Sequence, residues 1–504
     1  MTLLCLKPAK DIGKYNSLKT SVSYLSLSFV SKYDVCNIGE SAGISRLVAN
    51  FIDIKYFEPV SIAIKKTNME KIIKNCAGID IGSEKVFVAI ENQQVKSFRT
   101  FTASYKELGN YLKLHGIEQV AMEATGIYWI TLYDILEEMK FKIALVNPTD
   151  SKNLPGRKTD VQDCQWIQQL YSHGLLRESF VPQDLVRKLR VYTRMREDKL
   201  QMASSHVQHM QKALIEMNIR LPEVLSQTHG VSGMAMIKAI LQGERNATTL
   251  LNYCSKELQK RKGADILLAL DGNFKKEYLF ELQQAYDGYL FYLEQVKVCD
   301  QHAEEVLIDF NKKENNPYSD DIKPKHIRHN KPQIENLHKL LQGIHGANPT
   351  VLPGITDYGF MRLTAELGNN INQWANVKSF VSWLGLAPGK NQSGKTNKRS
   401  KKRAVTRAGQ IFKQAAQSLL VSKELGLGAF ARRLKARRGA AVAIKATARK
   451  LAELYYKIFS KGMEYVEKGV EMYQQRIKEQ QIRFLTKKAT ELNLQLVEIQ
   501  PNGI

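Results

Sequence analysis

The chain has 504 residues, 43% of them hydrophobic and 25% charged, which is enough for two to four domains with apolar cores. Lys and Arg outnumber Asp and Glu by 74 to 50, so the formal net charge is +24, and such a surplus favours polyanionic partners. Six scattered cysteines without a CxxC pair argue against a disulfide framework or a zinc ribbon. No apolar run approaches the ~18 residues of a membrane span, so we predict a cytoplasmic protein without membrane contact.

Residues 1–68 show weak periodicity and no motif, and we predict a leader that is disordered or not native, with Met69 as the natural start. A short accessory domain is the alternative. Residues 69–180 alternate strand-like and helix-like patterns, which is typical of an α/β domain with helices on the faces of a mixed or parallel sheet. We predict strands over residues 79–90 (with a turn near Gly82), 95–102, 119–123 and 142–147, and helices over residues 105–114, 127–139 and 158–173.

The rest of the chain is predicted to be mostly helical. Residues 181–315 contain two long helical stretches whose apolar positions recur every three or four residues, as in a coiled coil. We predict an antiparallel arm for dimerisation, with a compact bundle as the alternative. Residues 316–335 have the composition of a linker. A mostly helical domain over residues 336–470 and a helical tail over residues 471–504 follow, so the fold class is α/β plus all-α.

Four acidic residues stand where an acid is locally unusual. Asp80 interrupts an apolar run, and Glu123 follows a short apolar run and precedes Ala-Thr-Gly. Asp160 and Asp163 are three positions apart, so they project from one face of the predicted helix. Gathered carboxylates are costly unless a cation neutralises them, and hard oxygen ligands suit Mg²⁺, which also accepts substrate phosphates. We therefore predict that Asp80, Glu123, Asp160 and Asp163 are catalytic metal ligands for phosphoryl transfer.

Positive charge is concentrated in residues 389–450, which hold 18 Lys and Arg against one acid, Glu424. A solvated charged surface would mix the two signs, so we predict a nucleic-acid-binding surface. The candidate residues are Lys390, Lys395, Lys398, Arg399, Lys401, Lys402, Arg403, Arg407, Arg432, Arg433, Arg437 and Arg438. Within this stretch Ser393 lies beside a glycine in a basic context, where an exposed serine could act as a nucleophile, although Ser-Gly pairs are also common in loops.

Together these motifs resemble the DEDD transposases of insertion-sequence family 110. The resemblance rests on the sequences GIDIG at residues 78–82, MEATG at 122–126, NP at 147–148, KTDVQD at 158–163, LPGI at 352–355, AELG at 365–368, WLGLAP at 383–388 and QSG at 392–394. It covers residues 77–465 in the order of that family, which implies an RNase H/RuvC-like domain, a helical (coiled-coil) arm and a C-terminal transposase domain. The leader and the long extensions between and after the catalytic domains depart from the family pattern.

The resemblance implies a site-specific recombinase that moves its own insertion sequence. In that family the DEDD acids bind Mg²⁺ and a serine of the C-terminal domain becomes covalently linked to DNA. Carried over, this makes Asp80, Glu123, Asp160 and Asp163 the metal ligands and Ser393 the nucleophile. The resemblance also implies double-stranded donor and target DNA and a structured non-coding bridge RNA as partners. It further implies a homo-oligomer, a dimer or tetramer, in which the acids of one protomer meet the serine of another.

Three alternatives remain open on the residues alone. A metal-dependent hydrolytic nuclease such as a RuvC-like junction resolvase would use the same acids to activate water and would need no serine. Residues 78–83 also resemble the first phosphate loop of actin-like sugar kinases and ATPases, but no further Gly-rich phosphate motif is convincing. A decayed transposase that only binds nucleic acid is the third alternative, and the intact acids and Ser393 argue against it.

Overall fold

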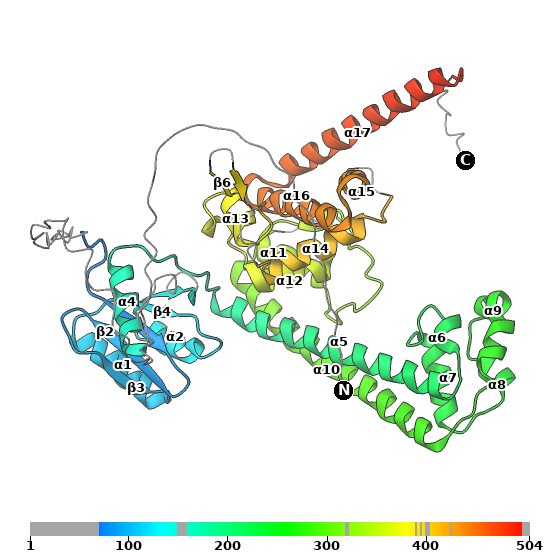
Figure 1. Ribbon diagram of the computed structural model, residues 1–504, viewed down its shortest axis with the longest axis horizontal. Coiled ribbons are helices and arrows are strands. Elements are labelled where there is room, and N and C mark those ends of the chain that lie inside the picture. Colours follow the sequence, from blue (N-terminus) through cyan, green and yellow to red (C-terminus); the bar gives the residue numbers. More distant parts are fainter. Residues whose placement is uncertain are drawn as a thin grey trace, which may run out of the picture. The chain divides into compact units, whose positions relative to one another are not determined.

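The computed structural model describes residues 70–148, 159–317, 322–388, 391–393, 396–398, 404–423 and 426–495 (Figure 1). The leader predicted over residues 1–68 lies outside these ranges. Within them, no helix is long and apolar enough to cross a membrane.

The N-terminal part of the described chain is built on a mixed five-stranded sheet with strand order β3-β2-β1-β4-β5. The first three strands form an antiparallel meander, and β4 and β5 run parallel to β1. The strands are β1 (Cys76–Ile81), β2 (Lys85–Ile90), β3 (Lys96–Arg99), β4 (Gln119–Glu123) and β5 (Lys142–Val146). The run predicted over residues 79–90 is thus two strands, and the chain turns between them at the predicted position near Gly82.

Helices cover both faces of this sheet, as the alternation of elements predicted. On one face, α1 (Thr102–Leu114) and α2 (Trp129–Glu138) bury Leu108 and Leu132 against Ile79 and Met122. On the other face lies α4 (Asp160–Ser172), whose Ile167 packs against smaller residues of the strands. The strand order, the mixed pairing and the flanking helices together define an RNase H-like domain, in agreement with the sequence.

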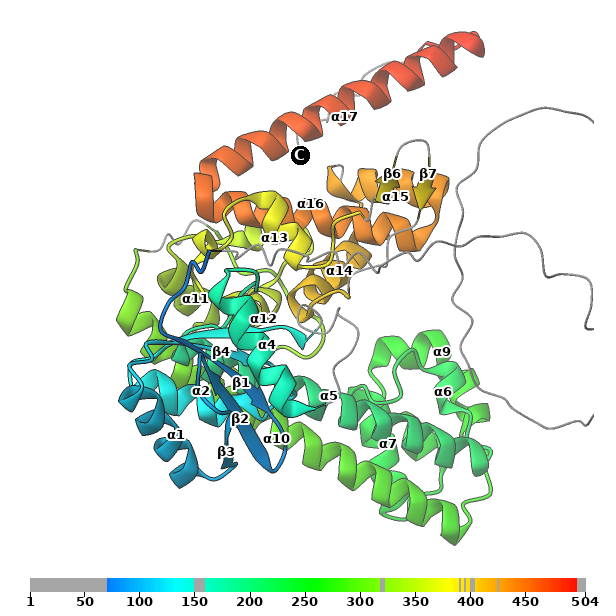
Figure 2. The same ribbon diagram turned by 60° about the vertical axis from the view of Figure 1, so that its left-hand side comes forward.

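Two long antiparallel helices follow, α5 (Asp184–Glu216) and α10 (Lys276–Glu314), which run side by side in both views (Figures 1 and 2). Their antiparallel alignment is fixed by paired residues such as Arg196 with Asp300 and Lys212 with Glu281. Between them the chain forms a small helical bundle with its own apolar core, composed of α6 (Leu221–Val224), α7 (Val231–Leu241), α8 (Ala247–Leu251) and α9 (Lys256–Ala269).

The remaining described residues form a mostly helical domain. Its helices are α11 (Leu337–His345), α12 (Asp357–Leu367), α13 (Val377–Trp383), α14 (Arg407–Leu419), α15 (Leu427–Arg438), α16 (Ala440–Lys461) and α17 (Met463–Glu491), with short 3-10 turns at Pro349–Val351 and Ile371–Gln373. A two-stranded hairpin, β6 (Asn391–Ser393) and β7 (Thr396–Lys398), lies between α13 and α14. The core of this domain includes Val186 and Leu189 from α5 and Leu307 and Phe310 from α10, so one end of each long helix packs in it.

Candidate active site

Asp80 and Glu123 lie at the carboxyl ends of two neighbouring parallel strands. Ile79 of β1 stands opposite Met122 of β4, so the next residue on each strand is an acid. Side chains alternate between the faces of a sheet, and Ile79 and Met122 are buried on the face of α1 and α2. Asp80 and Glu123 therefore both point to the opposite face, which is the face that α4 covers.

Helix α4 brings the other two acids to the same face. Its N-cap is Thr159, whose side chain accepts a hydrogen bond of 3.4 Å from the backbone N–H of Gln162. Asp160 and Asp163 occupy the first turn. Cys164 and Ile167, one turn further along, are buried against the sheet, so the helical period places both acids on the sheet-facing side.

The approach of α4 to the sheet depends on Gly78, two residues before Asp80. A Cβ atom at position 78 would lie 2.8 Å from the Cα atom of Gln168 and would collide with the carbonyl oxygen of Cys164. The backbone of α4 thus rests directly on β1, where no side chain intervenes. This close packing is what brings the first turn of α4 to Asp80.

The four carboxylates influence one another electrostatically. The pKa of Asp80 is raised to about 6, first by burial and then by the negative charges of Glu123, Asp160 and Asp163. Glu123 is itself buried, with 4% of its surface exposed. An acid that is hard to ionise, surrounded by three further acids, is the signature of a site that needs a cation to neutralise it.

The chemistry of this donor set fits a divalent metal ion. Its ligands would be carboxylate oxygens, which Mg²⁺ and similar hard cations prefer. Burial, assisted by the charge of Asp80, raises the pKa of the neighbouring Cys164 to about 12, so its thiol stays neutral and does not compete as a ligand. Within the described residues, no three His, Cys, Asp or Glu side chains are arranged to hold one ion as they stand. The acids are gathered at one end of the sheet, and ligation would draw them closer.

Ser393 lies on a different element, at the end of β6, where it pairs with Thr396 of β7 (Figure 2). The described residues that precede and follow this hairpin in the chain, near Gly385 and Val405, lie against each other. Gly385, with φ of 72°, approaches the Val405 backbone so closely that a Cβ atom would lie 2.8 Å from its Cα atom. The backbone N–H of Thr406 also donates to the carbonyl oxygen of Leu384 at 3.3 Å. The WLGLAP motif thus packs against the residues just before α14.

The structure describes part of the predicted nucleic-acid surface. On α15, Arg433, Arg437 and Arg438 are exposed, whereas Arg432 donates to the carbonyl oxygen of Ser422. For Lys398 only the strand is described. The remaining candidates lie outside the described residues: Lys390, Lys395, Arg399, Lys401, Lys402 and Arg403.

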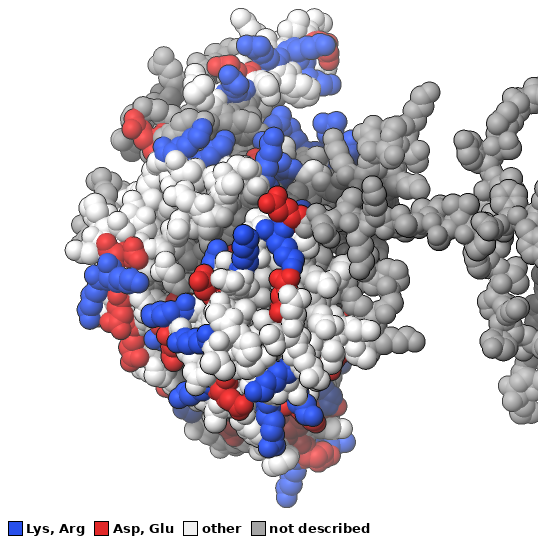
Figure 3. Space-filling view, turned by 90° about the vertical axis from the view of Figure 1, so that its left-hand side faces the viewer, with Lys and Arg blue, Asp and Glu red and all other residues white. Residues whose placement is uncertain are grey.

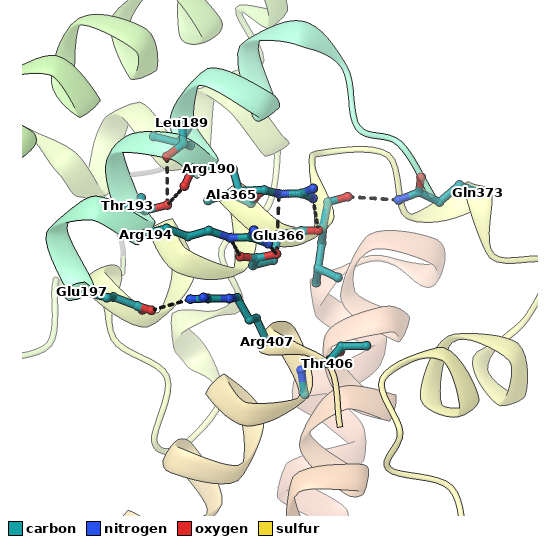
Figure 4. A network of polar contacts seen from close by, with 12 residues as sticks. Leu189, Arg190, Thr193, Arg194, Glu197, Ala365, Glu366, Gln373, Thr406 and Arg407 are labelled. Carbon is teal, nitrogen blue, oxygen red and sulfur yellow. Dashed lines mark hydrogen bonds and ion pairs between the residues drawn. The ribbon is translucent and has the colours of Figure 1, made fainter. Parts of the chain in front are cut away.

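Arg407, the first residue of α14, belongs to a network of ion pairs that the sequence did not reveal (Figure 4). It lies 3.7 Å from the carboxylate of Glu197 on α5, and 54% of its side chain remains exposed. Glu366 of α12 accepts two hydrogen bonds of 2.8 Å from Arg194 of α5, and Arg190 donates to the backbone oxygen of Glu366 at 2.9 Å. Glu366 belongs to the AELG motif, and this fork-shaped pairing gives that motif a structural role.

Charges on the visible surface are otherwise mixed. Figure 3 shows acidic and basic side chains interspersed over the lower part of the face that it views. The count of 18 Lys and Arg against one acid in residues 389–450 thus contrasts with the mixed charges on that part of the face.

An RNase H-like sheet with four carboxylates near one end, two on its strands and two on α4, is an arrangement typical of enzymes that process nucleic acids. A family model of DEDD transposases of the IS110 type, described as transposase, matches residues 77–219. A second model, described as transposase IS116/IS110/IS902 family, matches residues 350–430. The chain belongs to the IS110 family of transposases and is an enzyme that acts on DNA. The DEDD match also indicates dependence on a divalent metal. None of the curated proteins compared with the chain matches it.

Proposed function

We propose that this transposase cuts and rejoins DNA through a covalent serine–DNA intermediate, with Mg²⁺ held by Asp80, Glu123, Asp160 and Asp163. The observation that supports the metal site is the raised pKa of Asp80 among three other carboxylates. Mg²⁺ would neutralise the acids and the charge that develops on the transferring phosphate. In the metal-free protein, Asp80 would hold a proton below about pH 6, and that proton must leave before the carboxylate can act as a ligand.

The nucleophile in this proposal is the hydroxyl of Ser393. Its oxygen forms a bond to a backbone phosphorus of DNA while one P–O bond of the backbone breaks. The serine gives up its proton, and the departing DNA oxygen takes up a proton to become a hydroxyl. The same steps in reverse, with a hydroxyl from a second DNA strand, release the serine and join the strands. The energy of the phosphodiester is kept in the intermediate, so no external energy source is needed.

The remaining partners follow from the family resemblance. The exposed Arg433, Arg437 and Arg438 of α15 would contact phosphates, together with the Lys and Arg residues that precede α14 in the sequence. A structured bridge RNA would supply sequence recognition through base pairing with donor and target DNA, as in other guided systems. A homo-oligomer that works in the cytoplasm is part of the same proposal. It is supported by the location of the acids and Ser393 on separate elements, since a composite site would unite them from two protomers.

Covalent trapping tests the chemistry. The full-length protein, purified with its co-eluting RNA, would be mixed with Mg²⁺ and labelled DNA of the element ends and separated on a denaturing gel. We expect a protein–DNA adduct that disappears in Ser393→Ala and in Asp80→Ala. Ser460→Ala, which removes an exposed serine of α16, is the matched control and should retain the adduct. Ribonuclease treatment before mixing should abolish the adduct if RNA guides the reaction.

The principal alternative, a hydrolytic nuclease, predicts a different gel. DNA would be cut in the presence of Mg²⁺ without an adduct, and Ser393→Ala would cut as well as the wild type. That result would replace the serine mechanism with direct attack by water.

A further inference from the structure

Residues 322–339, here called the basic strap, are predicted from composition to fall largely within a linker, yet in the structure they are bound along their length to the C-terminal domain and the long helices. The carbonyl oxygen of Asn330 accepts a hydrogen bond of 3.0 Å from the buried Arg196 of α5. The backbone N–H of Gln333 donates to Asp300 of α10 at 3.0 Å. Lys325 donates to the carbonyl oxygen of Leu352 at 2.7 Å. The strap is therefore a fixed surface element.

The strap carries an excess of positive charge on its outer side. It holds five Lys and Arg residues and one acid, Glu335. Four of the five cations are exposed: Lys323, Arg328, Lys331 and Lys339. Two exposed histidines, His326 and His329, lie among them. This surface is separate in sequence from the basic stretch at residues 389–450.

A pocket of about 300 Å³ opens within the strap, between it and the start of α11. Most of its wall is apolar, formed by Ile322, Pro324, Ile327, Pro332, Ile334 and Leu337. Three lysines also line it, Lys323, Lys331 and Lys339. Its volume lies at the low end of the roughly 300–1,000 Å³ found for small-ligand sites. An apolar recess with cations at its mouth fits a flat apolar ring attached to an anion.

Two polar groups at the pocket differ in their availability. The ring nitrogens of His338 lie 2.6 Å from Asp357 and 2.8 Å from the carbonyl oxygen of Ile322, so this side chain is used to hold the strap against α11 and α12. Asn336, the N-cap of α11, makes no side-chain capping bond. Its amide is thus available to pair with the edge of a ring bound in the pocket.

We propose that this pocket binds the base of an unpaired nucleotide, while Lys323 and Lys331 bind the phosphates on either side of it. Bases offer apolar faces for Ile327 and the two prolines and a polar edge for Asn336, and a basic surface that follows the strand supplies the phosphate contacts. An enzyme that exchanges DNA strands generates such unpaired nucleotides, and an RNA partner would present them in loops. The ligand chemistry is the same for both, and the strap forms this site without any contribution from the four acids or Ser393.

The test measures binding of labelled single strands of about ten nucleotides by fluorescence anisotropy, with DNA, RNA and duplex DNA as separate arms. The variant is Lys323→Ala/Lys331→Ala, which removes two exposed cations that form no hydrogen bond or ion pair within the described residues. We expect single-strand affinity to fall about tenfold, and the slope of log affinity against log salt to fall by about 1.4, or about 0.7 for each lost phosphate contact. The matched control, Lys256→Ala/Lys260→Ala on α9, removes the same charge from exposed positions and should stay within twofold.

Recognition of the base itself needs a second measurement. A strand with a photoactivatable thymidine analogue should crosslink to the peptide that contains residues 322–339. A strand with an abasic site in place of the analogue should bind more weakly than the intact strand. This loss of affinity should be larger for the wild type than for the double variant. The larger loss in the DNA or in the RNA arm identifies the natural source of the nucleotide. An equal loss for duplex DNA, crosslinks only outside the strap, or no penalty for the abasic strand would each overturn the pocket assignment.

Discussion

Gly78 lies directly against the backbone of Gln168: a Cβ atom at position 78 would be 2.8 Å from the Cα atom of Gln168. The two residues belong to β1 and α4, the two elements that supply Asp80 and the pair Asp160 and Asp163. The geometry of the acidic site is thus set by a contact between backbone atoms of β1 and α4.

Replacing Gly78 by alanine should therefore damage the acidic site. The added methyl group must push α4 away from β1, because the atoms that it meets are backbone atoms. We expect Mg²⁺ affinity and adduct formation each to fall at least tenfold, with a loss of stability of about 1–3 kcal/mol from overpacking. Calorimetric titration of Mg²⁺ and the trapping gel would measure this. Gly263→Ala on α9 is the control, since its Cβ atom would meet Leu251 at an ordinary 3.7 Å.

Asp80→Asn should stabilise the metal-free protein while it abolishes the reaction. The folded-state pKa of Asp80 is raised to about 6, so the folded protein resists ionisation of this group and loses stability as pH rises from about 4 through 6. Removal of the charge should raise the Tm at pH 7.5 by about 1–2 °C, a small effect because the site is partly solvated. The difference should shrink at pH 5. A lower Tm for the variant at pH 7.5 would contradict the electrostatic account.

Metal affinity should depend on pH in the same range. Since a protonated Asp80 cannot act as a ligand, Mg²⁺ binding must release one proton below about pH 6. We expect the affinity to rise about tenfold per pH unit up to about pH 6 and to level off above about pH 7. Titration calorimetry in buffers of different ionisation enthalpy reports both the affinity and the released proton. Affinity that stays constant across this range would show that Asp80 is already ionised in the metal-free protein.

Gly385→Ala should affect the serine hairpin and spare the acidic site. Residue 385 has φ of 72° and lies against the backbone of Ala404 and Val405. Alanine is strained at such a φ, and its methyl group must push residue 385 away from residues 404–405. We expect adduct formation to fall at least tenfold, with Mg²⁺ affinity unchanged. If adduct formation and Mg²⁺ affinity were lost together, the substitution would be unfolding a larger part of the chain. Gly359→Ala in α12, where the Cβ atom has room, is the control.

Loss of the buried ion pair between Arg196 and Asp300 should be costly. The two groups are 2.6 Å apart and each side chain is 1% exposed, and Arg196 also lies over the ring of Tyr358. Asp300→Ala should lower stability by about 3–5 kcal/mol, because it leaves a buried guanidinium unpaired. The double change Arg196→Met/Asp300→Leu should cost much less. Denaturant unfolding measures both, and Arg261→Ala, whose partner Glu257 is 82% exposed, should change stability by at most about 0.5 kcal/mol.

The sequence by itself determined the local elements and the identity of the acids. Short apolar runs in residues 119–123 and 142–147 predicted β4 and β5 closely, because the tendency to form a buried strand depends on neighbouring residues. The oddness of Asp80 and Glu123 in apolar surroundings marked them as candidates, since an acid is placed there only at a cost.

Only the tertiary structure decided what these elements do together. The strand order β3-β2-β1-β4-β5 brings Asp80 beside Glu123, and the bare backbone at Gly78 lets α4 add the last two acids. The composition of residues 316–335 predicts a linker, but the hydrogen bonds of the strap to Arg196 and Asp300 arise from positions more than 30 residues away. Such contacts depend on the path of the whole chain, and no local pattern of residues encodes them.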